Sequence, residues 1–218
     1  MSILKIGLAP FGLAMSPNIS LIIINRFSAS YGGKSAIAVY ACIAYMICII
    51  YLIFQSVGDG SQPLISRCYG ERDFVRLKSI RRLAYAFAML LAVIGCVVMY
   101  LTKGSLGFLF GASHDVNVEV AKISPIFLIS VPFVAVTRVT TASFYASGKS
   151  VPSNLLTFIE RVLMLLLMLI LPPLFGGQVM IWWSTVIARI LSSILALLLK
   201  SYVDRHDLSN ILSKGTEK

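Results

Sequence analysis

Three long runs without a charged residue constrain the fold of this chain more than any other feature. The runs are Ser35–Val57, Leu83–Leu101 and Val162–Ala188. A helix crosses the hydrocarbon core of a bilayer with about 20 mostly apolar residues. Only 13% of the 218 residues are charged, whereas soluble domains have about 25%. The sequence therefore predicts an all-α, polytopic membrane protein.

Turn-forming residues divide the apolar sequence into six predicted spans. A glycine pair at 32–33 separates the first two spans, and Pro172-Pro173 with Gly176-Gly177 end the fifth. We expect a single six-helix membrane unit over residues 1–203 and a polar, frayed cytoplasmic tail over 204–218. The predicted spans are about 3–26, 36–66, 83–101, 121–147, 152–171 and 179–200.

The distribution of lysine and arginine predicts the orientation of the chain. Loops after the odd-numbered spans hold 3 of these residues, and the opposite side of the membrane holds 12. Cytoplasmic loops carry the excess of basic residues, so both termini are expected in the cytoplasm, at the plasma (inner) membrane. Because the basic residues lie at membrane edges, the net charge of +10 does not indicate a nucleic-acid partner. Membrane lipid is the expected surrounding.

The basic segment from Arg67 to Arg82 marks the exit of the second span from the membrane. Phe74, Leu77 and Ile80 fall on one helical face within it, with basic residues around them. This pattern is typical of a short interfacial helix on anionic lipid. An ordinary basic loop explains the charges equally well.

Ionisable residues inside predicted spans are the candidate functional residues, because a charge in lipid is costly. Asp59 lies near the cytoplasmic end of the second span, where Gly58, Gly60 and Pro63 are expected to loosen the helix. Two interpretations stay open. Asp59 is a proton- or cation-binding carboxylate at a flexible point of the helix, or it is an acidic side chain that is simply hydrated at the cytoplasmic end of the helix.

The remaining in-span charges lie on the fourth, fifth and sixth predicted spans. Arg138 and Arg189 fall near the middle of theirs, so we expect each to face a water-filled cavity or an acid on another helix. Glu160 and Arg161 are adjacent and point about 100° apart on a helix, so they are not expected to be ideal partners. A role in a gate and a role in interfacial packing are both open for this pair.

Enzyme and metal chemistry receive no support from the sequence. His114 and His206 have no metal-ligand partner at a useful spacing, and no arrangement of a nucleophile with a base is visible. We therefore expect no enzyme activity, no metal and no cofactor. Pro132 lies within the fourth span, and kinked helices near a cavity are typical of transporters that alternate access.

A set of motifs resembles a known transporter family. Gly60-Ser61-Gln62-Pro63-Leu64-Ile65, then Tyr69-Gly70 and a short basic stretch, is similar to the eighth helix and following loop of MATE (multidrug and toxic compound extrusion) transporters. The segment Ile3–Pro10 resembles the seventh helix of that family, and Phe144–Lys149 resembles the end of its tenth. The chain thus resembles the C-terminal six-helix lobe alone.

The resemblance implies antiport of H⁺ or Na⁺ against small organic compounds, through a cleft facing a second six-helix lobe. That lobe would be another copy of the chain or a separate chain. Two alternatives stay open: a flippase for an anionic lipid-linked substrate, which the in-span arginines favour, and a truncated membrane protein that transports nothing. The candidate residues of the cleft are Asp59, Gln62, Arg138, Glu160, Arg161 and Arg189.

Overall fold

The computed structural model describes residues 2–215, with side chains described for Phe11, Met15 and residues 18–205. Its ordered elements are helices, as the sequence predicts. They are α1 (Ser2–Gly70), α2 (Phe74–Thr102), α3 (Leu106–Leu109), α4 (His114–Ala146), α5 (Ser150–Phe175) and α6 (Gln178–Gly215).

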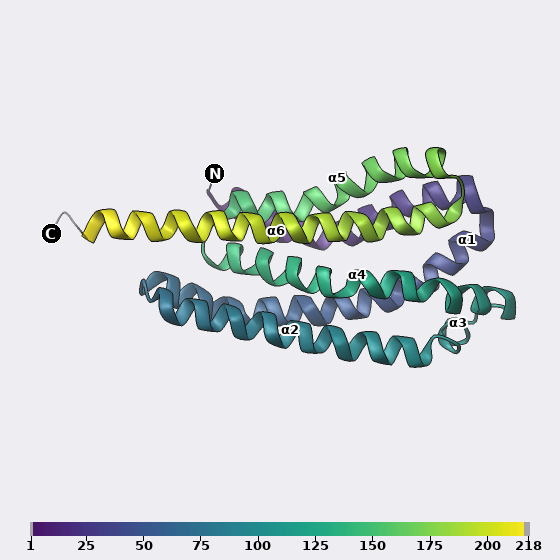
Figure 1. Ribbon diagram of the computed structural model, residues 1–218, viewed down its shortest axis with the longest axis horizontal. Coiled ribbons are helices and arrows are strands. Elements are labelled where there is room, and N and C mark those ends of the chain that lie inside the picture. Colours follow the sequence, from purple (N-terminus) through teal and green to yellow (C-terminus); the bar gives the residue numbers. More distant parts are fainter. Residues whose placement is uncertain (1, 216–218) are drawn as a thin grey trace.

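Helix α1 consists of two arms that reverse direction at Gly33, as Figure 1 shows. Gly33 has φ 65° and ψ −157°, a backbone conformation that is essentially limited to glycine. The first arm covers residues 2–32 and the second arm covers 34–70. The predicted turn at Gly32-Gly33 is therefore confirmed, and the chain has six membrane-length helical segments within the described residues.

The six segments lie side by side, and their connections alternate between the two ends of the bundle (Figure 1). Helix α4 packs against α1, α2, α5 and α6. Its buried positions are dominated by small and β-branched residues from Ser130 to Ser143, which allow neighbouring helices to approach closely. Helix α4 is therefore the central element of the lobe.

The start of α2 corrects one expectation. The amphipathic stretch around Phe74–Ile80 is not a separate interfacial helix, because α2 is continuous from Phe74 through Thr102. Asp73 caps its first turn by accepting a hydrogen bond from the backbone N–H of Arg76 at 2.9 Å. Leu77 and Arg81 are both buried, since this part of α2 packs against the rest of the bundle.

The ends of α5 and α6 differ from the predicted boundaries. Pro172 and Pro173 lie inside α5, which ends at Phe175 and is followed by Gly176 with φ 75°. Helix α6 continues past residue 204 through Gly215, and residues 216–218 lie outside the described part. Asp204 forms an ion pair with Arg81 on α2 at 2.7 Å, which holds this part of α6 against the bundle.

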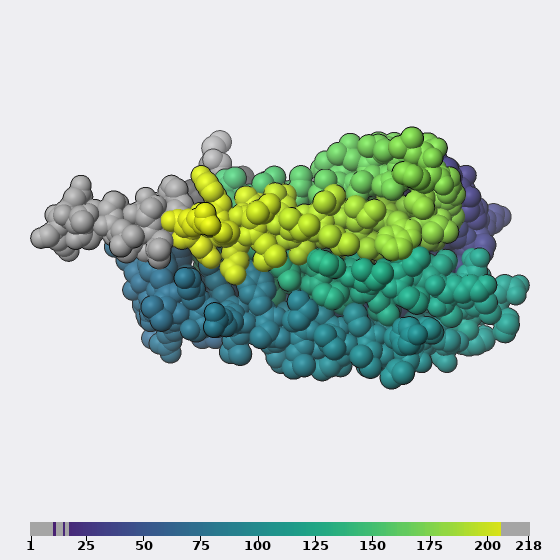
Figure 2. Space-filling model, in the orientation of Figure 1, coloured from purple at the N-terminus to yellow at the C-terminus, as the bar shows by residue number. Residues whose placement is uncertain are grey.

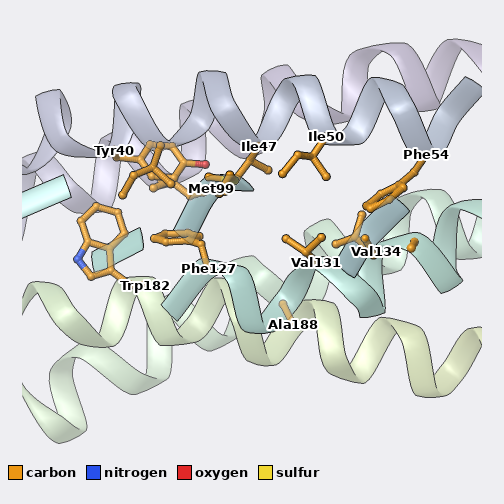
Figure 3. Packing of buried hydrophobic residues seen from close by; sticks show 14 of the residues in the cluster. Tyr40, Ile47, Ile50, Phe54, Met99, Phe127, Val131, Val134, Trp182 and Ala188 are labelled. Carbon is orange, nitrogen blue, oxygen red and sulfur yellow. The ribbon is translucent and has the colours of Figure 1, made fainter. Parts of the chain in front are cut away.

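The core is apolar and rich in aromatic side chains (Figure 3). The rings of Tyr40 and Trp182 stack at 5.6 Å, and Phe127 meets Trp182 edge-on at 5.7 Å. The opposite sides of the helices expose large apolar residues, as on α2 from Leu83 to Leu101. An apolar exterior of this kind faces lipid in a membrane protein. Figure 2 shows α2, α4, α5 and α6 together on one face of the molecule.

Candidate functional site

Three helices bring a cluster of charged side chains to the centre of the bundle. Arg161 and Glu160 on α5 form an ion pair of 2.6 Å between Nη1 and Oε1. Arg189 on α6 places its Nε 3.8 Å from the same Glu160 oxygen. The expectation that Glu160 and Arg161 are poor partners was therefore wrong. Two flexible side chains on adjacent residues reach one another because both are buried away from competing water.

Arg189 is held by neighbours on three other helices. Its Nη1 donates a hydrogen bond of 2.9 Å to Ser130 Oγ on α4, and its guanidinium carbon lies 5.4 Å from the ring centre of Tyr51 on α1. The guanidinium carbon of Arg138 on α4 lies at the same distance from that ring. Tyr51 thus accepts cation–π contacts from two arginines. The expected acid on another helix exists for Arg189, and it is Glu160.

The cluster lies well inside the bundle, away from both of its ends. Glu160 is ten residues from the start of α5 at one end of the bundle, and Arg189 is eleven residues from the start of α6 at the other end. At 1.5 Å per residue, each lies about 15 Å from its end. This distance is about half the thickness of a hydrocarbon core of about 30 Å.

A cavity of about 360 Å³ opens beside this cluster, between the two arms of α1. Asn18 and Asn25 of the first arm and Tyr40 and Tyr51 of the second arm line it. Arg161 and Arg189 complete the lining from α5 and α6.

Three buried polar atoms at the cavity have no hydrogen-bond partner within the described residues: Asn25 Oδ1, Tyr51 Oη and Arg189 Nε. Buried polar groups are normally hydrogen-bonded. Water or a polar ligand in the cavity would therefore supply the missing hydrogen-bond partners.

Asp59 and Gln62 lie away from this cluster. Asp59 is exposed, and it is two helical turns beyond Tyr51, or about 12 Å along the axis of the second arm. Its Oδ1 accepts hydrogen bonds from Gln55 Nε2 at 3.0 Å and from Gln62 Nε2 at 2.8 Å. The structure thus brings Asp59 together with Gln62, but not with the arginines.

The residues expected to loosen the helices lie in regular helix. Gly33 is the position in α1 at which the backbone departs from helical geometry, so Gly58, Gly60 and Pro63 do not interrupt it. Pro132 lies inside α4, which is continuous around it. A Cβ atom added at Gly58 would lie 2.9 Å from the Cβ of Ala142. Gly58 therefore permits close packing of α1 against α4.

Sequence reasoning missed the uncharged polar lining of the cavity. Asn18 and Asn25 are seven residues apart, and Tyr40 and Tyr51 are eleven apart, so each pair falls on one helical face. This spacing was the available signal. In the part of the chain that the structure describes, no group of three or more His, Cys, Asp or Glu side chains is placed to hold a metal ion.

The comparisons with known proteins agree with this geometry. The MatE family model matches residues 12–170. The multidrug export protein MepA of Staphylococcus haemolyticus (strain JCSC1435) is 24% identical over 196 residues, which are 89% of this chain and 42% of MepA.

Solved structures show the same fold at low sequence identity. A MOP superfamily transporter from Pyrococcus furiosus, described as having a binding pocket of reverse polarity, superposes with a TM-score of 0.83 at 18% identity, over 90% of this chain and 45% of that one. An outward-facing multidrug resistance MATE transporter superposes with a TM-score of 0.83 at 17% identity, with the same coverage. The chain therefore spans about half the length of these relatives. Because the family model covers most of the chain, this protein belongs to the MATE family of membrane transporters.

Proposed function

We propose that this chain is the C-terminal lobe of a MATE-type secondary transporter and works against a second six-helix lobe. The observation that carries the proposal is the cavity between the two arms of α1, which is lined mainly by apolar residues and also by two asparagines, tyrosines and two arginines. Transporters built from repeated units bind their substrates near the midplane, at the interface of the repeats. The second lobe is a copy of this chain or a separate chain, and it supplies the opposing wall of the cleft.

The proposed orientation places both termini in the cytoplasm of a cell with this protein in its plasma (inner) membrane. The basic residues near the start of α2 and the end of α6 support it. The end of the bundle with Gly33, α3 and the α5–α6 turn then faces outward. The cavity is reached from the lobe interface, close to the middle of the membrane.

Asp59 is the proposed protonatable group of the coupling cycle. Its carboxylate accepts hydrogen bonds from two neutral amides, those of Gln55 and Gln62. Glu160, in contrast, is buried and contacts two guanidinium groups. A carboxylate whose charge is already balanced by two arginines is poorly suited to exchange H⁺ or Na⁺. The exposed Asp59 is free to do so, with Gln62 orienting it.

The presence of a second lobe is tested by measuring the mass of the detergent-solubilised protein isolated from its native membrane. Any chain that co-purifies with it is identified. A dimer or a pair with a second six-helix chain supports the proposal. A monomer without a partner contradicts it and favours the alternative of a truncated chain that transports nothing.

Coupling is tested in proteoliposomes that contain the intact assembly. A pH or Na⁺ gradient is imposed, and the gradient-driven movement of a fluorescent organic cation is recorded. Asp59→Asn is expected to abolish the response to the gradient. Glu71→Gln is the matched control, because Glu71 is another exposed acid near the same end and is paired with Arg67. Equal losses in both variants, or no loss in either, contradict the role of Asp59.

An anionic substrate is the second candidate, and the charge of the central cluster favours it. Arg138, Arg161 and Arg189 gather around a single acid, Glu160, which leaves a positive excess at the cavity. A lipid-linked anion would be attracted there, as expected of a flippase. Competition between an organic anion and an organic cation for binding separates the two candidates. Arg189→Gln weakens binding of the anion if the second candidate is correct.

A further inference from the structure

A second cavity, lined by charged and apolar residues and distinct from the central one, lies where the start of α2 meets residues 197–205 of α6. Its volume is about 380 Å³. In Figure 2 the last coloured part of α6 lies beside the N-terminal part of α2 at this end of the molecule. The lining includes four basic residues, Lys78, Arg81, Lys200 and Arg205, and a single acid, Asp204.

Arg81 forms the inner wall of this cavity. Its side chain is 5% exposed and forms an ion pair of 2.7 Å with Asp204, and its Nη2 donates a hydrogen bond of 3.3 Å to Ser147 Oγ on α4. Its Nε is buried and has no hydrogen-bond partner within the described residues. A buried N–H of a guanidinium group without an acceptor is costly. An acceptor from outside the chain, placed in this cavity, would relieve that cost.

The surroundings of the cavity indicate the kind of molecule that supplies the acceptor. Phe74, Leu77 and Leu197 line the cavity beside the basic residues. Farther along both helices toward the membrane centre, the exposed surface on the side of the cavity is apolar, with Met89 on α2, eleven residues from Lys78, and Ile194 on α6. A ligand that fits both regions has an anionic head and an apolar tail. A small soluble anion uses the basic residues alone.

We propose that this cavity binds the phosphate headgroup of an anionic phospholipid, with the acyl chains lying along α2 and α6. Basic pockets between helices on the cytoplasmic side of a membrane bind such headgroups. Arg81 donates to the phosphate from inside the cavity, and Lys78 and Lys200 contact it from the two helices. The site lies on the outer face of the lobe and does not depend on the proposed transport function.

The direct test measures lipid retention by native mass spectrometry. The assembly is purified in detergent and offered phosphatidylglycerol or phosphatidylcholine. The wild-type protein is expected to retain phosphatidylglycerol and to lose phosphatidylcholine. Lys78→Gln with Lys200→Gln is expected to weaken retention of phosphatidylglycerol by roughly tenfold or more, since each basic residue near an anionic headgroup contributes about 1 kcal/mol.

A matched control separates this site from general attraction between charges. Arg72 and Arg76 are exposed basic residues near the start of α2, and they are not part of the cavity lining. Arg72→Gln with Arg76→Gln removes the same charge and is expected to change retention less than twofold. Equal losses in the two double variants overturn the proposal.

Two further measurements complete the test. Asp204→Asn removes the acid that competes for Arg81, so it is expected to increase retention of phosphatidylglycerol; a decrease in a folded variant contradicts the role of Arg81. Inorganic phosphate and glycerol phosphate at millimolar concentration are expected not to displace the lipid. Displacement by either one shows a site for a free phosphate and overturns the assignment to a lipid. Lys78→Gln alone, at an exposed position, serves if the double variant does not fold.

Discussion

The Nε of Arg189 on α6 lies 3.8 Å from the Oε1 of Glu160 on α5, well inside the helical bundle. This contact joins two helices through charges in a region where water is scarce. The same carboxylate also pairs with Arg161 at 2.6 Å. Glu160 is therefore the shared counter-charge of two buried arginines, and the stability of the lobe depends on it.

Glu160→Gln is expected to lower the free energy of unfolding by about 3–5 kcal/mol, the usual cost of leaving a buried charge without its partner. Thermal unfolding in detergent, followed by tryptophan fluorescence, measures the change. Asp59→Asn is the control, because Asp59 is exposed and its partners are neutral amides; the expected change is within about 0.5 kcal/mol. Similar midpoints for Glu160→Gln and the wild type would show that the pair does not stabilise the lobe.

Much of this fold follows from patterns of apolar and turn-forming residues. The uncharged runs fix the membrane class, and Gly32-Gly33 marks the reversal in α1. Helix ends were harder to predict. Phe74–Arg82 is polar enough to read as a surface segment, yet it continues into α2 because Leu77 and Arg81 are buried by neighbouring helices. Such tertiary contacts cannot be obtained from local sequence.

The sequence predicts which charged residues belong to the candidate site, but it does not predict how they are arranged. The cost of a charge in lipid singles out Glu160, Arg138 and Arg189. The meeting of Arg138 and Arg189 at Tyr51 depends on how α1, α4 and α6 are rotated, and a tyrosine in an apolar run gives little sign of that role. The roles of Asp59 and Gln62 in coupling stay predictions.

Gly58→Ala tests the close approach of α1 to α4. The added Cβ would lie 2.9 Å from the Cβ of Ala142, so we expect a loss of about 1–3 kcal/mol from overpacking. Gly60→Ala is the matched control, since a Cβ there meets nothing within 4 Å, and alanine favours helix. Ala142→Gly in the Gly58→Ala background is expected to restore part of the loss. A neutral Gly58→Ala would show that the two helices separate easily.

Two substitutions of Tyr51 separate the contribution of its cation–π contacts to stability from that of its hydroxyl group. Tyr51→Phe keeps the ring that Arg138 and Arg189 contact at 5.4 Å, so unfolding in detergent is expected to stay close to that of the wild type. Tyr51→Leu removes the ring and is expected to cost about 1–2 kcal/mol for the contacts between buried cations and an aromatic face. Equal effects of the two substitutions would show that the ring does not matter.

Gly33→Ala tests the reversal between the two arms of α1. Gly33 has φ 65° and ψ −157°, and a residue with a Cβ in this region is strained by about 1–3 kcal/mol. A Cβ at Gly33 meets nothing within 4 Å, so any loss comes from the backbone and not from a steric clash. Gly70→Ala is the control, because a Cβ there is also without neighbours and the φ of Gly70 is not positive.

Gly33→Ala and Gly70→Ala also test what sets the width of the cavity, because its walls are the two arms of α1 that Gly33 joins. A strained reversal is expected to alter the separation of Asn25 and Tyr51 across the cavity. A pair of spin labels, one on each arm, measures this separation in the folded protein. A changed distance in Gly33→Ala and an unchanged distance in Gly70→Ala is the expected result. Unchanged distances in both would mean that helix packing alone, without the backbone of Gly33, sets the width of the cavity.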